Sequence, residues 1–261
     1  MVSLATLKAV RLTPTLVVRF MLLPLHRVRN PCLYCPGICL TACPTFLASG
    51  NLAMSPLGYS RNINLGREKC VKCWRCVREC PLGYPLPETF HDTPIKLTLS
   101  IAKEGKPTLV VSEGLEESIG TKLAEKYGLG LAVVRGITER YTEGRRVEIS
   151  SLRKVLKTLR HRDPVAMSPE VAHSLGIPFL LEMPELLKPV SFTGRVHVPC
   201  LILDKGERVL RSLEKVNINV TEVVVDKCIK VSSVEPDTLY LCPRATLHNA
   251  KTIFDLMLSD G

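Results

Sequence analysis

Two closely spaced runs of cysteine are the feature that most limits what this chain can fold into. Each run has four cysteines and ends in Cys-Pro: Cys32, Cys35, Cys39 and Cys43 before Pro44, then Cys70, Cys73, Cys76 and Cys80 before Pro81. A disulfide framework is one explanation, but such frameworks belong mostly to small secreted proteins with a poor core. This chain has 261 residues, of which 46% are hydrophobic, so it can bury a core without cross-links. The runs therefore favour metal binding or redox chemistry.

The spacing of the second run indicates the kind of metal site. Its pattern is C-x2-C-x2-C-x3-C-P, which is typical of bacterial ferredoxins. In that pattern three thiolates bind one [4Fe–4S] cluster, and the fourth binds the other cluster of a two-cluster protein. Structural zinc is the alternative, but it needs only two close pairs of ligands. The spacing therefore predicts an iron–sulfur site.

The first run nearly repeats this pattern. It reads C-x2-C-x3-C-x3-C-P, with one extra residue in the stretch Pro36-Gly37-Ile38, where glycine tolerates the additional turn. Two such runs predict two [4Fe–4S] clusters with exchanged fourth ligands. The predicted sets are Cys32, Cys35, Cys39 and Cys80 for cluster 1, and Cys70, Cys73, Cys76 and Cys43 for cluster 2. The 26 residues between the runs suggest helical connections.

The charge of the chain favours a docking role. The formal net charge is +10, and four of the cations, Lys69, Lys72, Arg75 and Arg78, flank the second run. These cations could raise the potential of a cluster or simply form a solvated loop. The single tryptophan, Trp74, could shield a cluster, contact a partner or pack internally. A basic surface suits an acidic redox partner, a nucleic acid or an anionic membrane, but with 5% aromatic residues no stacking platform for single strands is evident.

The first 30 residues are apolar and basic. Pro14 could open a short helix and Pro24 would end it. Such a helix could pack on the cysteine-rich region or contact a membrane subunit of a larger complex. The segment lacks the features of a secretory signal, and no run is long enough to span a membrane. We therefore expect a cytoplasmic protein, with membrane association through a partner as the alternative.

A different pattern begins near residue 98. Short apolar runs predict strands, and apolar residues at helical spacing predict helices between them. The expected strands are 108–111, 131–134, 164–167, 195–198, 220–225 and 239–241, and the expected helices contain residues 115–123, 152–159, 209–213 and 246–258. This alternation predicts an α/β fold with a mostly parallel sheet flanked by helices. The domains expected are 1–97, which is helical and holds both clusters, and 98–258, which could consist of repeats 98–190 and 191–258.

Three cysteines lie outside the two runs. Cys200, Cys228 and Cys242 each lie at or just past the end of a predicted strand. Because the carboxyl ends of parallel strands share one edge, the three thiols could form a third site. His197 or Asp226 could then complete a ligand set. The alternative is that these are buried, inert cysteines.

The chain resembles the heterodisulfide reductase family, and more broadly the iron–sulfur subunits of anaerobic glycerol-3-phosphate and glycolate dehydrogenases. The resemblance rests on the two cysteine runs, on His197-Val198-Pro199-Cys200 and on Leu241-Cys242-Pro243. It implies a helical two-cluster ferredoxin domain followed by cysteine-rich repeats, each with Pro-Cys, Cys-Cys-Gly and Cys-x-x-Cys. Here Cys200 matches the first motif, but Lys227-Cys228-Ile229 and Cys242-Pro-Arg-Ala245 match the others incompletely. Residues 107–190 look like an earlier repeat without cysteines.

These features lead to one expected function and two alternatives. We expect an electron-transfer subunit of a larger oxidoreductase complex, whose partners are other redox proteins. The first alternative is an enzyme in which Cys200, Cys228 and Cys242 hold a third cluster that reduces a disulfide or a related substrate. The second is a basic iron–sulfur protein that binds nucleic acid.

Overall fold

A computed structural model describes residues 14, 18, 30–225, 230 and 233–259. The chain divides into two compact units. The first unit is Met1–Asp92 with Glu143–Arg145, and the second is Thr93–Thr142 with Arg146–Gly261. The helix expected between Pro14 and Pro24 lies outside the described residues, as do Asp226 and Cys228.

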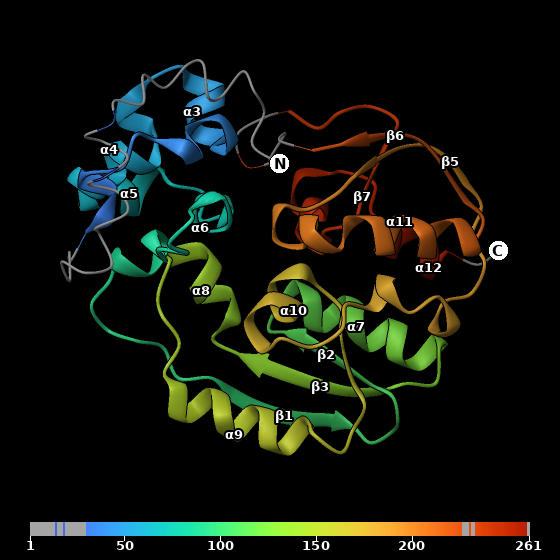
Figure 1. The fold of residues 1–261 in the computed structure, drawn as a ribbon. Coiled ribbons are helices and arrows are strands. Elements are labelled where there is room, and N and C mark those ends of the chain that lie inside the picture. Colours follow the sequence, from blue (N-terminus) through green and yellow to red (C-terminus); the bar gives the residue numbers. More distant parts are fainter. Residues whose placement is uncertain (1–13, 15–17, 19–29, 226–229, 231–232, 260–261) are drawn as a thin grey trace. The chain divides into compact units, whose positions relative to one another are not determined.

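Short helices make up the first unit, which is coloured blue to cyan in Figure 1. Proline at the first turn, where its missing N–H is not needed, begins several of them. Side chains cap others: the hydroxyl of Ser55 accepts from the N–H of Gly58, and the amide oxygen of Asn62 accepts from Leu65. The elements are η1 Pro31–Leu33, η2 Ile38–Ala42, α3 Pro44–Ser49, η3 Leu52–Met54, α4 Pro56–Arg61, α5 Ile63–Lys69, α6 Arg75–Glu79 and η4 Leu86–Thr89. The connection between the cysteine runs is therefore helical, as expected.

A small aromatic core holds the first unit together. Tyr59, Leu86 and Phe90 are each at most 2% exposed, and partly buried side chains that include Cys70 and Cys76 pack against them. Gly66 allows the close approach of Phe90, since a Cβ atom on this glycine would lie 2.6 Å from the Phe90 ring. Cys70 and Cys76 thus pack directly against the hydrophobic core of this unit.

The second unit begins with a four-stranded sheet in the order β1-β3-β2-β4. The strands are β1 Thr98–Lys103, β2 Thr108–Ser112, β3 Gly130–Arg135 and β4 Pro164–Ala166. β2 is parallel to β3 and β4, whereas β1 is antiparallel to β3. All five residues of β2 are buried, which explains its unbroken apolar sequence.

Helices accompany this sheet. α7 (Leu115–Lys126) lies along β2 and β3 in Figure 1, and α9 (Ile149–Leu159) packs against β1. α7 ends at a turn in which Gly128 has φ +68°, a value suited to glycine, so the sequence Gly128-x-Gly130 serves a turn. The remaining elements of this part are α8 Ile137–Glu143, α10 Pro169–Leu175, η5 Leu180–Glu182 and η6 Pro184–Leu186.

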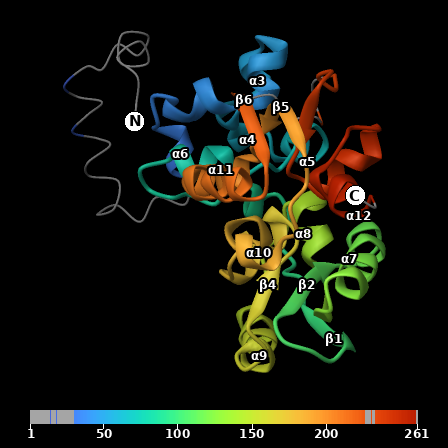
Figure 2. The same ribbon diagram turned by 90° about the vertical axis from the view of Figure 1, so that its right-hand side faces the viewer.

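A second sheet, wholly parallel, follows in the order β6-β5-β7. Its strands are β5 Phe192–His197, β6 Ile218–Val224 and β7 Thr238–Tyr240, and Figure 2 shows β5 and β6 side by side. α11 (Gly206–Lys215) packs against β6 and carries the buried residues Val209 and Leu213. The other elements are η7 Cys200–Lys205, η8 Pro243–His248 and α12 Ile253–Leu258.

The fold confirms the expected α/β class and corrects its details. Each predicted strand is present, but β1, α8 and α10 were not predicted. The prediction of a single helix over 246–258 is wrong in its first half. Asn249 adopts a left-handed conformation (φ +58°) that separates η8 from α12, and only α12 is an α-helix. Among the described residues, no helix has the length and apolar content needed to cross a membrane.

Candidate iron–sulfur centre

The first cysteine run winds through two short 3₁₀ helices. Cys32 lies in η1, Cys39 lies in η2, and Gly37 turns the chain between them with φ +89°. The backbone N–H of Gly37 donates to the sulfur of Cys35 over 3.4 Å. A Cβ atom at this position would lie 2.7 Å from the flexible end of the Leu40 side chain, so glycine is favoured mainly by the positive φ and also by the limited space. The extra residue in this run is accommodated at the glycine, as the sequence suggested.

The second run bends through two left-handed residues, Lys72 (φ +52°) and Trp74 (φ +63°). Such conformations are uncommon outside glycine, and successive N–H groups arranged in this way form concave anion sites. The N–H of Lys72 donates to the sulfur of Cys70 over 3.4 Å. Cys73 precedes α6, Cys76 lies within it, and Cys80 follows it. This geometry resembles a loop that wraps an anionic centre.

The two runs meet at a cavity in the first unit. Its lining includes Cys32, Cys35 and Cys39 from the first run and Cys76 and Cys80 from the second. The other lining residues are uncharged: Pro31, Ile38, Pro56, Leu57, Pro81, Leu82, Tyr84 and Leu86. The predicted ligand set of cluster 1 is thus gathered around one space.

The thiols in this cavity are costly to ionise. Burial, together with the neighbouring Cys35 and Cys80, raises the pKa of Cys32 to about 12. Burial also raises the pKa of Cys39 strongly, with added effects of Cys35 and Cys32. Thiolates in such a site need bound cations to balance their charge, and iron supplies that balance in a cluster. The donor set therefore fits the predicted cluster.

The ligands predicted for cluster 2 lie around Tyr59. Burial raises the pKa of this phenol to about 12, with smaller increases from Cys70, Cys43 and Cys73 and an opposing effect of its hydrogen bond to Thr45. The Tyr59 hydroxyl donates to Thr45 Oγ1 over 3.0 Å, and the same oxygen lies 3.1 Å from the sulfur of Cys43. Three of the four predicted ligands therefore share one neighbour.

The fourth predicted ligand, Cys76, lies between the two sets. It lines the first cavity, and its pKa is raised well above the usual value by burial and then by Cys70, Cys39 and Cys43. Within the described residues, no three His, Cys, Asp or Glu side chains lie close enough to bind a single metal ion. A cube differs from such a site, because each thiolate binds a different iron atom.

The residues that flank the second run differ in burial and in their contacts. Trp74 is 5% exposed, so it packs inside the unit rather than against a partner. Lys72 is 7% exposed, and its ammonium donates to the carbonyl of Arg67 over 2.5 Å. Lys69 and Arg78 are exposed, and Arg75 forms a 3.7 Å ion pair with Glu79. By contrast, residues 30–60 contain no charged side chain. Cationic side chains therefore lie within the second run and none lies within the first, although Arg27 and Arg29 precede the first run.

Two of the three remaining cysteines share a sheet edge. Cys200 follows β5 and Cys242 follows β7, and these strands are parallel neighbours in which His197 is paired with Tyr240. The imidazole of His197 lies against the Tyr240 ring, with ring centroids 5.0 Å apart. Cys228 and Asp226 lie outside the described residues, so the full predicted set is not placed.

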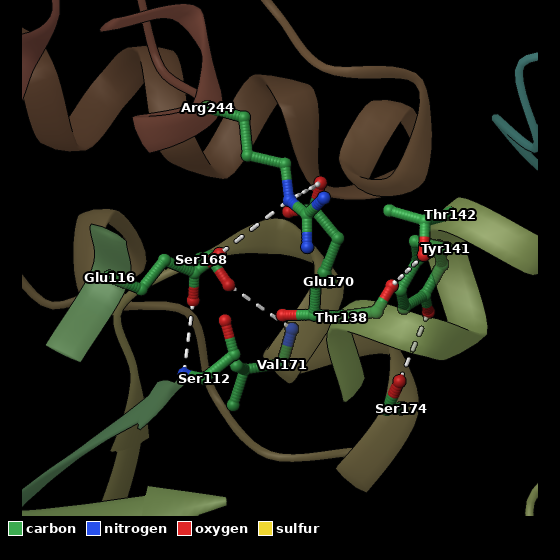
Figure 3. Close-up of polar contacts among 10 residues, drawn as sticks. All are labelled: Ser112, Glu116, Thr138, Tyr141, Thr142, Ser168, Glu170, Val171, Ser174 and Arg244. Carbon is green, nitrogen blue, oxygen red and sulfur yellow. Dashed lines mark hydrogen bonds and ion pairs between the residues drawn. The ribbon is translucent and has the colours of Figure 1, made fainter. Parts of the chain in front are cut away.

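A buried cluster of charges beside Cys242 was not predicted from the sequence. Arg244 Nε lies 3.5 Å from Glu170 Oε1 and 3.9 Å from Glu116 Oε1 (Figure 3). The backbone N–H of Ser112 donates to the other oxygen of Glu116 over 3.1 Å. Glu116 is 2% exposed and Glu170 is 7% exposed. The available signal was the position of each glutamate in the first turn of a helix that follows a strand.

Burial in this cluster makes it unfavourable for Glu116 and Cys242 to ionise. Burial, followed by the Glu170 carboxylate, raises the pKa of Glu116 to about 7, although Arg244 opposes this effect. Burial and then Glu170 also raise the pKa of Cys242 well above its usual value. The groups that shift the pKa of Cys242 are Glu170, Glu116 and Arg244, whereas those that shift the pKa of Cys32 are other cysteines. The surroundings of Cys242 thus differ from those of the predicted cluster ligands and favour an inert cysteine.

Comparison with protein-family models, with curated proteins and with solved structures finds no match to this chain.

Proposed function

We propose that this protein carries electrons between redox partners through two [4Fe–4S] clusters held in its first unit. The observation that carries the proposal is the convergence of Cys32, Cys35 and Cys39 with Cys80, which belongs to the other run, around a single uncharged cavity. Two independent cysteine sites would not need a cysteine of one run to join the ligands of the other, whereas a two-cluster ferredoxin does.

Local features of the backbone support the same function. The N–H groups of Gly37 and Lys72 each donate to a cysteine sulfur, and such bonds stabilise negative charge on sulfur. When bound, the clusters would supply reversible one-electron transfer, which none of the protein side chains here provides. The chain keeps the cysteines buried or half-buried, orients them through its turns and sets the local charge.

The uneven charge suggests a direction for electron flow. Residues 30–60, which contain the first run, have no charged side chain, although Arg27 and Arg29 precede them, whereas Lys72 is buried beside the second run. A nearby cation stabilises the more negative, reduced form of a centre. Electrons would therefore move from the site of the first run toward that of the second.

The decisive experiment is metal analysis of protein purified without oxygen. We expect about 8 iron and about 8 acid-labile sulfide per chain, from two clusters of four iron each. Stoichiometric zinc without sulfide would replace this function with a structural zinc role. Iron bound without sulfide would also contradict it.

An enzyme with a third cluster is the second candidate, because Cys200 and Cys242 follow neighbouring strands at one sheet edge. Replacing Cys200, Cys228 and Cys242 together with serine tests it. A loss of about three or four iron, with the remaining signals unchanged, would establish the third cluster. An unchanged iron count would leave electron transfer through the first unit as the function.

A further inference from the structure

We propose that Thr45 directs a hydroxyl proton to the sulfur of Cys43 and so raises the reduction potential of the centre that Cys43 binds. The inference rests on the function proposed above, in which Cys43 completes the ligand set of cluster 2. Thr45 belongs to neither predicted ligand set. It acts through Cys43 and is therefore a positioning residue, with Tyr59 as its support.

The hydroxyl of Thr45 has three polar neighbours in the interior of the first unit. The Tyr59 hydroxyl donates to Thr45 Oγ1 over 3.0 Å, and Thr45 Oγ1 donates to the carbonyl of Met54 over 2.9 Å. The same oxygen lies 3.1 Å from Cys43 Sγ, in a hydrogen bond for which either atom can be the donor. The side chains of Thr45, Tyr59 and Cys43 are buried, so bulk water has little access to these contacts.

The charge state of Cys43 decides where the proton of Thr45 goes. A hydroxyl has one proton and two lone pairs. A Cys43 thiol can donate to Thr45 Oγ1, so the Thr45 proton is free to bond the Met54 carbonyl. A Cys43 thiolate can only accept, so its bond with Thr45 forms only when the proton turns from the carbonyl to the sulfur. The thiolate charge favours that turn, because a charge-assisted hydrogen bond is stronger than a neutral one.

A hydrogen bond from Thr45 to the Cys43 sulfur affects the potential in one direction. Such a bond stabilises negative charge on sulfur, and reduction adds negative charge to the centre. The bond is therefore stronger in the reduced state and raises the potential. Tyr59 increases the effect, because a hydroxyl that accepts a hydrogen bond becomes a stronger donor. The direction agrees with electron flow toward the site of the second run, which Cys43 is predicted to complete.

The corresponding position of the second run has no hydroxyl. Each run ends in Cys-Pro, and the residue after the proline is Thr45 in the first run and Leu82 in the second. The two cysteines have similar backbone conformations, with φ −82° and ψ 113° at Cys43 and φ −79° and ψ 120° at Cys80. A leucine side chain has no proton to donate to sulfur. The residue at this position therefore supplies a hydrogen bond to one exchanged ligand and not to the other.

The test is a redox titration of the protein with its clusters, followed through the spectra of the reduced centres. Thr45→Val removes the hydroxyl and keeps the shape of the side chain. We expect the equilibrium constant for reducing one centre to fall about tenfold, which is about 59 mV for one electron. The other potential should not change. The centre that shifts should be the one that Cys43→Ser removes, and Thr45→Ser, which keeps the hydroxyl, should retain the wild-type potential.

Tyr59→Phe provides a second variant. It keeps the Thr45 hydroxyl and removes only the group that donates to it, so we expect a smaller shift of the same centre in the same direction. Ser60→Ala is the matched control. Ser60 is a buried serine of the same helix, and its hydroxyl donates to the carbonyl of Leu57 rather than to a side chain near a cysteine. This variant should leave both potentials at their wild-type values.

The outcomes separate this inference from the function on which it rests. Wild-type protein without iron and sulfide would overturn both. Wild-type protein with about 8 iron, together with an unchanged potential in Thr45→Val, would overturn only the role of Thr45. An equal shift in Thr45→Val and Thr45→Ser would do the same, because it would show that shape rather than the hydroxyl matters. If Thr45→Val loses its iron, Tyr59→Phe decides, and an unchanged potential in that variant refutes the inference.

Discussion

Cys32 and Cys80 belong to different cysteine runs and line the same cavity. The Cys80 thiol adds to the increase in the pKa of Cys32, so the two sulfur atoms are electrostatic neighbours. The segment between them folds into short helices that pack on Tyr59 and Phe90, and this packing brings the second run back to the first. The relationship leads directly to a test of ligation.

Replacing Cys80 with serine should remove the cluster of the first run and spare the other. Iron should fall from about 8 to about 4 per chain, because a weakly bound cube is lost as a unit. Cys43→Ser should produce the complementary loss. Spectroscopy of the reduced protein can distinguish the two centres, and Cys200→Ser is the control that should leave both signals intact. If Cys80→Ser removed the centre of Cys70 and Cys73 instead, the exchange of ligands would be refuted.

Gly37→Ala should disturb the first site more than Gly83→Ala does. Both glycines have positive φ, so each substitution carries a backbone penalty of about 1 kcal/mol. At Gly37 a Cβ atom would also lie 2.7 Å from Leu40, whereas at Gly83 there is open space. We expect reduced iron retention in Gly37→Ala during exposure to a chelator, and near-normal retention in Gly83→Ala. Equal retention in the two variants would show that the packing at Gly37 does not matter.

Arg244→Met should destabilise the second unit strongly. The substitution leaves Glu116 and Glu170 buried together without their cation, and breaking a buried ion pair from one side costs about 3–5 kcal/mol. Denaturant unfolding measures the loss. Arg211→Met is the control, because Arg211 pairs with Glu207 on the surface at 3.4 Å and should contribute less than about 1 kcal/mol.

A second substitution checks the cause of that loss. Adding Glu116→Gln to Arg244→Met removes one of the two buried carboxylates and should recover part of the unfolding free energy. A double variant that is less stable than Arg244→Met would mean that packing, rather than charge, explains the effect.

The stability that depends on His173 should decrease as the pH falls. Although His173 is an exposed residue, partial desolvation of its ring, followed by the charge of Arg140, lowers the pKa of His173 from 6.5 to about 4. Its Nδ1 lies 2.6 Å from the Tyr141 hydroxyl, and the two groups share a hydrogen bond. Between about pH 6.5 and 4 the unfolded chain binds a proton at this site that the folded chain does not bind, so acid favours unfolding.

His173→Asn isolates this effect, because an amide can form a hydrogen bond with Tyr141 but does not titrate. The unfolding free energy of the variant, measured from pH 7 to pH 4, should decline less steeply than that of the wild-type protein. Parallel curves would show that His173 does not contribute to the pH dependence.

Local patterns predicted much of the second unit. The apolar runs at 108–111 and 131–134 became β2 and β3, because strands buried on both faces require continuous apolar sequence. β1 was not recognised, since its residues are mostly exposed or half-buried and its pairing with β3 is antiparallel. The apolar pattern near the end of the chain predicts one helix, but the left-handed conformation of Asn249 ends η8 before α12 begins. Apolar periodicity does not indicate the backbone conformation of a single residue.

The sequence by itself determined which residues of the first unit are the candidate metal ligands. Cysteine spacing within each run is a local property, and a thiol at every third or fourth position restricts the chain to tight turns around a shared centre. The helical connection between the runs also followed from its length. These properties depend on neighbours along the chain and so can be read without a structure.

Tertiary structure decided which distant side chains meet. The burial of Glu116, Glu170 and Arg244 in one cluster requires α7, α10 and η8 to pack together, and no spacing in the sequence records this contact. A pocket lined by Lys126 and Lys188 likewise depends on the meeting of four segments. Burial raises the cost of a charge and so changes what a carboxylate or a thiol can do. The chemistry of Cys242 therefore follows from its surroundings, whereas that of Cys32 and Cys80 was already implied by their spacing.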